Sequence, residues 1–143
     1  MKRFWKFAPW MSRLILLPPV VIFALIASRY LLHPVQAGAA IGLAFNSPLA
    51  ITIVRVGLGA FPLGCSVFTL ACLVSSDRLL TGLGFVSTMI SLALVVRVAG
   101  MLADHTVSQN TGLVRAEVVL LVLMGIGTVV ESRRRSIEVK SAA

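Results

Sequence analysis

The sequence predicts an all-α fold, an integral membrane four-helix bundle whose helices run up-down-up-down. Hydrophobic residues make up 58% of the 143 residues, and the mean hydropathy is +0.98. A soluble domain is only about 45–50% apolar even when glycine is counted. The apolar residues gather in four long runs, and about 20 residues suffice to cross the hydrocarbon layer. A chain this apolar must place its surface against lipid.

The first span is expected at residues 14–32. Residues 1–13 form a basic, aromatic lead-in, and tryptophan at a membrane boundary anchors the helix that follows. Pro18 and Pro19 lie in the first turns of the run, where proline is tolerated.

A cleaved signal peptide is the alternative interpretation of this N-terminal segment. The basic start, the short apolar run and the small-residue sequence at 35–37 resemble a cleavage signal. Arg29, Tyr30 and His33 would then lie between the apolar core and the cut, which argues against cleavage. The three later spans would keep the same orientation in either case.

The second span is expected at residues 51–74. Residues 33–50 carry Gly, Ala and Pro but no formal charge, so we expect an outside loop with a short interfacial or re-entrant helix. Pro62 should kink the span by freeing a carbonyl one turn earlier, and Ala60 and Gly64 form a small-xxx-small pair. Cys65 and Cys72 lie about 10 Å apart along a helix axis, too far for a disulfide, so we expect them to be small packing residues.

The second half of the chain contains two further long apolar runs, separated by short polar segments. Residues 75–78 form a tight turn, 79–103 the third span, 104–112 a second outside loop and 113–130 the fourth span. The chain thus divides into a lead-in (1–13), a four-span bundle (14–130) and a basic tail (131–143).

The distribution of basic residues predicts the orientation of the chain. The net charge is +8, from 13 Lys and Arg against 5 Asp and Glu. The two outside loops hold no Lys or Arg, whereas the segments expected inside hold Lys2, Arg3, Lys6, Arg13, Arg78, Arg133, Arg134, Arg135 and Lys140. The positive-inside rule therefore places both termini in the cytoplasm. Because the charges flank apolar runs, we expect a lipid bilayer as the partner and no nucleic acid.

Several charges fall inside the predicted spans, near their outer ends. A charge at mid-bilayer costs about 2.5–3.5 kcal/mol on insertion scales, so each one needs a reason. We hypothesise a polar network facing the bundle interior and formed by Arg55, Arg97, Asp104 and Glu117. It either binds a ligand, or it only fixes helix register while the arginines snorkel to the headgroups.

No sequence pattern points to catalysis. The chain has no glycine-rich phosphate loop, no CxxC and no HExxH, so we expect no enzyme activity. His33 and His105 follow spans one and three, and paired histidines can hold haem or a metal. Both lie at loop starts, so we expect no metal and no cofactor.

Three stretches resemble a bacterial family of four-helix inner-membrane proteins of unknown function. They are IVRVGLGAFPLGCSVF, ALVVRVAGMLAD and VRAEVVLLVL, which carry Arg55, Gly57, Gly59, Arg97, Asp104 and Glu117. His105 departs from the family pattern, in which a glycine is expected. The resemblance spans roughly residues 14–130, and the architecture is more distantly similar to DoxX-type proteins. It implies a multi-pass protein of the cell inner membrane and supplies no activity. Small multidrug exporters fit poorly, because span one lacks their mid-span acid.

Two functions remain open from the sequence. The first is a non-enzymatic small membrane subunit, or an assembly or stress partner, that contacts itself or another membrane protein. The second is a small transporter or a binder of lipophilic or anionic ligands, in which the four-residue cluster receives an anionic group.

Overall fold

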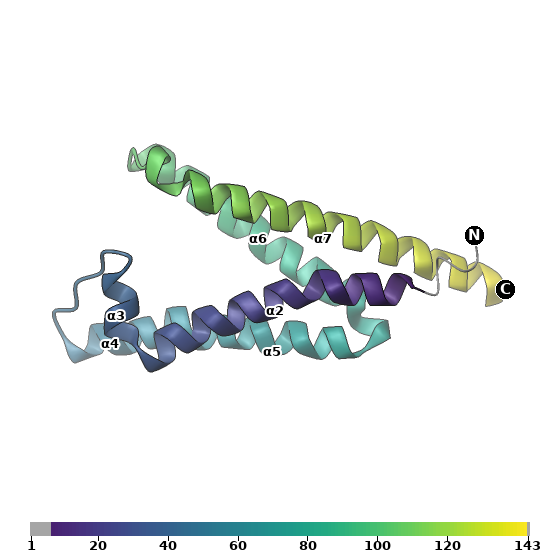
Figure 1. The fold of residues 1–143 in the computed structure, drawn as a ribbon, viewed down its shortest axis with the longest axis horizontal. Helices are drawn as coiled ribbons and strands as arrows, with labels where there is room; N and C mark the ends of the chain where they lie inside the picture. Colours follow the sequence, from purple (N-terminus) through teal and green to yellow (C-terminus); the bar gives the residue numbers. More distant parts are fainter. Residues whose placement is uncertain (1–6, 143) are drawn as a thin grey trace. The chain divides into compact units, whose positions relative to one another are not determined.

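The computed structural model describes residues 7–142, except for the side chains of Gln109 and residues 138–142. This part of the chain is helical and contains no strand, which confirms the all-α fold class. In chain order (Figure 1) the elements are α2 (Ala8–Leu32), α3 (Pro34–Ala39), α4 (Pro48–Val54), the π-helix η1 (Arg55–Ala60), α5 (Phe61–Val74), the 3₁₀ turn η2 (Ser76–Arg78), α6 (Leu79–Ala103) and α7 (Val107–Ala142).

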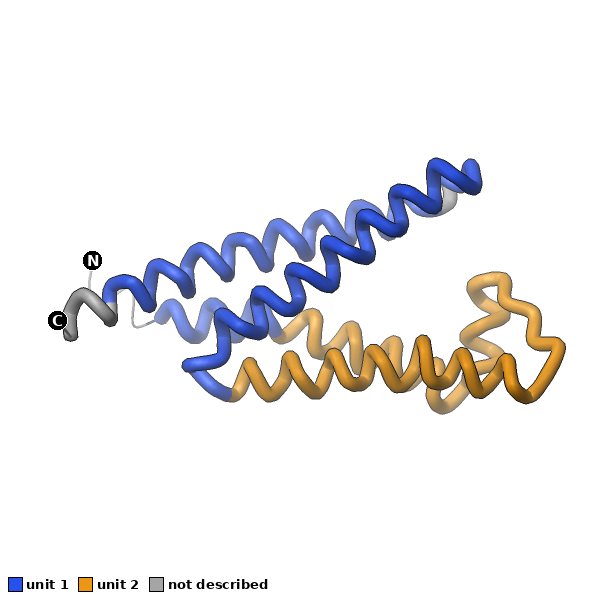
Figure 2. Tube along the Cα trace, turned by 180° about the vertical axis from the view of Figure 1, so that it is seen from behind, with its two compact units in different colours: residues 1–16, 75–143 blue, residues 17–74 orange. Residues whose placement is uncertain are grey.

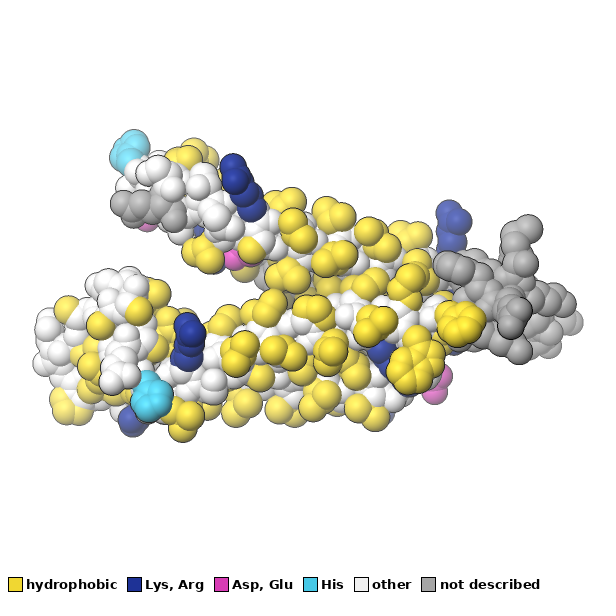
Figure 3. Space-filling view, in the orientation of Figure 1, with side chains coloured by type: hydrophobic (Ala, Val, Ile, Leu, Met, Phe, Trp, Pro, Cys, Tyr) yellow, Lys and Arg dark blue, Asp and Glu magenta, His cyan; other side chains and the backbone are white. Residues whose placement is uncertain are grey.

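Four helical stretches are long and apolar enough to cross a membrane. They are Ala8–Leu32, Pro48–Val74, Ser76–Ala103 and Asn110–Ile137, which confirms the prediction of four long apolar helices. Between 11% and 28% of each span is buried inside the protein, so most of their side chains face outward. Apolar side chains cover the greater part of the face seen in Figure 3. These features indicate a multi-pass membrane protein.

The chain divides into two compact units, shown in Figure 2: unit 1 comprises residues 1–16 and 75–143, and unit 2 comprises residues 17–74. In unit 2, the rest of α2 runs antiparallel to α5. Ser66 donates a hydrogen bond of 2.9 Å from its hydroxyl to the carbonyl oxygen of Val20. Further along, a Cβ added at Gly59 would lie 2.8 Å from the Leu31 side chain. Glycine at this position permits the close approach of the two helices.

Unit 1 contains the α6–α7 hairpin and the first turns of α2. Its buried apolar side chains come from all three helices and include Leu16, Leu79, Leu83, Val86 and Met124. A Cβ added at Gly127 of α7 would lie 2.8 Å from Leu83 of α6 and 3.3 Å from Ile15 of α2. Consecutive spans that pack within a unit, α2 with α5 and α6 with α7, are thus antiparallel, as an up-down-up-down order requires.

The effect of Pro62 is a local widening of the helix. Proline has no N–H, so the carbonyl oxygen of Leu58 loses its usual donor. In the turn before it, the N–H of Phe61 bonds to the carbonyl of Val56, five residues back, and residues Arg55–Ala60 form a π-helix. Such π-turns occur mostly as single inserted turns and are frequent at functional sites.

The turn between α6 and α7 is shorter than expected. Helix α7 begins at Val107, so only residues 104–106 remain of the predicted 104–112 loop. His105 has a φ of +54°, and the N–H of Thr106 bonds to the carbonyl oxygen of Met101 at 3.2 Å. This is the left-handed helix ending in which glycine is the usual residue, which gives a physical reason for the glycine expected at position 105.

Helices extend into both segments that were predicted as polar ends of the chain. Helix α2 begins at Ala8, and α7 continues as a helix to Ala142, through the predicted basic tail. The predicted helix in 33–50 is α3. Residues 1–6 of the predicted lead-in, with Lys2, Arg3 and Lys6, lie outside the described residues, as does the side chain of Lys140.

Candidate functional site

The structure joins two of the four predicted site residues, Arg97 of α6 and Glu117 of α7. Arg97 donates from Nε to Oε1 at 2.9 Å and to Oε2 at 3.0 Å, and from Nη2 to Oε1 at 2.7 Å. The two side chains are 30% and 17% exposed. Two-point pairing of a guanidinium with a carboxylate is the strongest geometry available to these groups, so each charge neutralises the other.

This pair forms because α6 and α7 are the two adjacent helices of one helical hairpin. Glu117 lies in the part of α7 that runs back past the last turns of α6, twenty residues after Arg97 in the sequence. The pair holds the two helices in one register near their connecting turn. A salt bridge in a low-dielectric setting is costly to break once formed, since either charge alone would be left unpaired.

The other two predicted residues have no hydrogen bond or ion pair with this pair among the described contacts. Asp104 is the C-cap residue that follows the last residue of α6, is exposed, and makes no ion pair or hydrogen bond through its side chain with a described side chain. Arg55 belongs to unit 2, where it begins η1 and is exposed. Participation of Arg55 and Asp104 in a network therefore stays a prediction.

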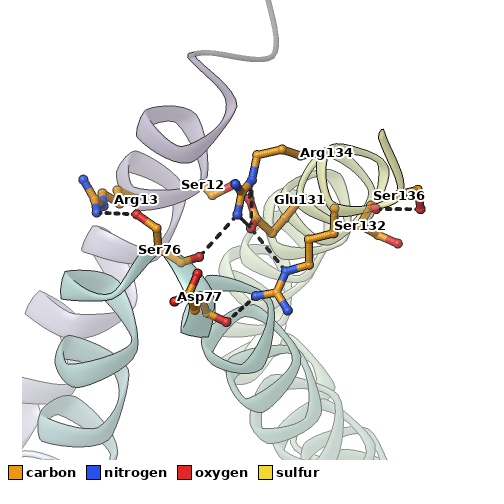
Figure 4. Close-up of polar contacts among 9 residues, drawn as sticks. Ser12, Arg13, Ser76, Asp77, Glu131, Ser132, Arg134 and Ser136 are labelled. Atoms are coloured by element: carbon orange, nitrogen blue, oxygen red, sulfur yellow. Dashed lines mark hydrogen bonds and ion pairs between the residues drawn. The ribbon is translucent and has the colours of Figure 1, made fainter. Parts of the chain in front are cut away.

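A second polar cluster lies at the opposite end of unit 1, where α2 and α6 begin (Figure 4). Its centre is Glu131, which is 0% exposed, and Arg134, which is 9% exposed. Arg134 donates from Nη2 to Oε1 of Glu131 at 2.5 Å and from Nε to both carboxylate oxygens at 3.1 Å. The hydroxyl of Ser12, also fully buried, donates to Oε2 of Glu131 at 3.3 Å. We call Ser12, Glu131 and Arg134 the Glu131 cluster.

Arginines connect the Glu131 cluster to the turn between α5 and α6. Arg134 donates to the carbonyl oxygen of Ser76 at 3.3 Å, and Arg135 donates to the carbonyl oxygen of Asp77. Arg13 donates to the hydroxyl of Ser76 at 3.0 Å and lies 5.6 Å from the ring centre of Trp10. These contacts tie the start of α2, η2 and the last turns of α7 into one end of the unit.

The sequence interpretation missed the Glu131 cluster because it assigned residue 131 to a polar tail. The available signal was the spacing of Glu131 from Arg134 and Arg135, three and four residues along, which places their side chains on one side of a helix. Ser12 gave no signal, since only the packing of α2 against α7 brings it to the carboxylate. Glu131 lies within the Asn110–Ile137 candidate span, one residue beyond the expected end of span four at residue 130.

The two histidines considered as metal or haem ligands belong to different units. His33 belongs to unit 2 and His105 to unit 1, and among the described residues no three His, Cys, Asp or Glu side chains group as a metal site would require. Cys65 and Cys72 are free, buried thiols in α5.

Comparisons of the chain with protein-family models, with curated proteins and with solved structures find no match.

Proposed function

We propose that this chain is a non-enzymatic, multi-pass protein of a bacterial inner membrane, with both termini in the cytoplasm, that acts as a small subunit or an assembly or stress partner of other membrane proteins. The observation that carries the proposal is a small-residue face on α5 with no neighbour. Ala60, the last residue of η1, and Gly64 of α5 lie four residues apart on one side of the second candidate span and are exposed, as is Ala71 seven residues further on, and nothing lies within 4 Å of a Cβ added at Gly64.

Small residues matter in membranes because they let two helix backbones approach closely. Gly59 already serves this purpose inside unit 2, where Leu31 packs against it. Gly64 lies in the same candidate span, and nothing lies within 4 Å of a Cβ added there. A helix of a partner, either a second copy of this chain or another membrane protein, would find here the surface that lateral association uses.

The internal polar contacts support the same proposal. Arg97–Glu117 fastens α6 to α7, and the Glu131–Arg134 pair within α7 contacts Ser12 of α2 and the Ser76 carbonyl of η2. A rigid hairpin of this kind suits a protein that presents a surface to a partner.

The test replaces Gly64 by isoleucine, which fills the small-residue face without a clash inside the protein. Gly125→Ile on α7 is the matched control, because a Cβ added at Gly125 also has nothing within 4 Å. Membranes carrying the protein at native level are solubilised in mild detergent and resolved by blue-native electrophoresis. We expect wild type and Gly125→Ile to migrate in a complex larger than the monomer and Gly64→Ile to migrate as the monomer. A monomeric wild type, or a complex that survives Gly64→Ile, overturns the proposal.

The alternative, a small transporter or ligand binder using Arg55, Arg97, Asp104 and Glu117, keeps the support of one observation. Arg55 is exposed and begins a π-helix. The bidentate pairing of Arg97 with Glu117 weighs against it for those two residues, because their charges already satisfy each other. A complementation assay separates the two: Arg97→Ala and Glu117→Gln abolish activity without loss of protein only if these residues bind a substrate.

A further inference from the structure

Unit 2 contains positive charges and no acid. Residues 17–74 include Arg29 and Arg55 but neither Asp nor Glu. Both arginines are exposed, and within unit 2 neither has an ion pair or a hydrogen bond through its side chain. Because the unit contains no carboxylate, it cannot neutralise either guanidinium by itself.

The antiparallel register of α2 and α5 brings both arginines to the same end of unit 2. Leu31 lies against Gly59, so Arg29 is two residues from this contact along α2 and Arg55 is four residues from it in the direction of the loop. At 1.5 Å per residue, the two positions differ by about 9 Å along the axis. His33, exposed and just beyond the end of α2, lies between these two levels. We call Arg29, His33 and Arg55 the basic loop end.

Apolar side chains surround the basic loop end. Leu32, Ile53 and Val56 are 70%, 61% and 61% exposed, and they lie within four residues of one or other arginine. Arg29 lies near the end of its candidate span and Arg55 near the start of its own. This is the depth at which acyl chains give way to headgroups. A ligand that fits must therefore combine an anionic head with an apolar body.

From this placement we propose that the basic loop end binds the phosphate of anionic phospholipid headgroups, with Arg29 and Arg55 as the cationic partners and the His33 ring as a further hydrogen-bond donor. Guanidinium groups bind phosphate oxygens in charge-assisted pairs, and basic side chains beside transmembrane helices select anionic lipid. An unpaired arginine near hydrocarbon is costly, so a phosphate supplies the counter-charge that unit 2 lacks. This inference is independent of the association proposed for the Gly64 face.

The test reads the lipid composition next to the basic loop end in the full-length chain. Leu32→Cys, in a background with Cys65→Ala and Cys72→Ala, is labelled with bimane, and the protein is reconstituted in phosphatidylcholine vesicles. Quenching by acyl-chain spin-labelled phosphatidylglycerol is compared with quenching by the matching phosphatidylcholine probe. We expect phosphatidylglycerol to quench at least about threefold more per mole in wild type, and raising NaCl from about 50 to 500 mM to reduce this preference.

Substitution of both arginines separates a specific site from general attraction. Arg29→Ala/Arg55→Ala should bring the quenching ratio to about one, Arg29→Lys/Arg55→Lys should keep most of the preference, and Arg115→Ala, at an exposed arginine of unit 1, should leave it unchanged. A ratio near one in wild type, a ratio that survives the double alanine variant, or one that is insensitive to salt overturns the proposal. Loss of the preference on adding about 10 mM inorganic phosphate would reassign the site to a soluble anion and overturn the lipid assignment.

Discussion

The two units hold their helices together by different chemistry. All five acidic residues of the chain lie in unit 1, where Arg97 pairs with Glu117 across the α6–α7 hairpin and Arg134 pairs with the buried Glu131. Unit 2 has no acid. It packs α2 on α5 through a Ser66 hydroxyl bonded to a backbone carbonyl and through the Gly59–Leu31 contact. Its two arginines therefore remain exposed.

This difference shows that the position of an arginine along a candidate span does not decide its contacts. Arg55 and Arg97 lie at similar depths by sequence, but only Arg97 has a carboxylate on the neighbouring helix. In unit 1, Arg97 forms an ion pair with Glu117 that fixes the register of α6 on α7. In unit 2 the side chain of Arg55 is exposed and has no carboxylate partner within its own unit. If this contrast is right, substitutions of charged residues should cost more stability in unit 1 than in unit 2.

The largest effect is expected at Glu131. Glu131→Gln keeps the size of the side chain but removes its charge, which leaves Arg134 as a buried charge without its main counter-ion. Breaking one partner of a buried ion pair costs about 3–5 kcal/mol, so the free energy of unfolding should fall by about 3 kcal/mol. Titration with SDS in mixed micelles, followed by circular dichroism, measures it.

Arg133→Gln is the matched control for this prediction. Arg133 is the exposed neighbour of Arg134, and an exposed substitution changes stability by less than about 0.5 kcal/mol. Because Arg133→Gln changes the net charge in the opposite direction, an opposite effect of similar size would show that Glu131 acts only through the net charge of this end, and an equal loss would contradict the role of the buried pair.

The contact that holds unit 2 should respond to Gly59→Ala. The added Cβ would lie 2.8 Å from Cδ2 and 2.9 Å from Cγ of Leu31, so the helices must separate or Leu31 must shift. Such overpacking costs about 1–3 kcal/mol. Gly57→Ala is the control two residues away, where an added Cβ meets nothing within 4 Å. The same unfolding titration should show a loss for Gly59→Ala only, and a loss of equal size in both variants would point to the π-helix instead.

A smaller effect is expected for the Arg97–Glu117 pair. A double-mutant cycle with Arg97→Ala and Glu117→Ala should give a coupling energy of about 1 kcal/mol, because the pair is partly exposed and polar contacts between membrane helices are modest. Arg55→Ala in unit 2 should change the unfolding free energy by less than about 0.5 kcal/mol. If Arg55→Ala destabilises the protein as much as Arg97→Ala, the contrast between the units is wrong.

The sequence was enough to predict where the helices lie along the chain, but not which side chains of different helices contact each other. Hydropathy is a local property, so the third span was placed at 79–103, the bounds that α6 has. The Glu131 cluster depends on the register of α2 against α7, and no local pattern reports that register. The pairing of Arg97 with Glu117 was proposed from their shared depth, whereas Arg55, at the same depth, belongs to the other unit.

The turn between α6 and α7 offers the smallest and most specific test. His105 has a φ of +54°, a conformation that costs a residue with a Cβ about 1–2 kcal/mol and costs glycine almost nothing. Glycine also gives the unfolded chain more freedom, which offsets about 0.4–1 kcal/mol of the gain. His105→Gly should therefore raise the unfolding free energy by about 0.5 kcal/mol. His105→Ala keeps the Cβ and should give no gain, so a difference between the two variants in the same titration isolates the backbone effect. Because this turn joins the helices that carry Arg97 and Glu117, a stabilising His105→Gly should leave the coupling energy of that pair unchanged. A change in the coupling would mean that the turn, and not the register of α6 on α7, determines whether the two charges meet.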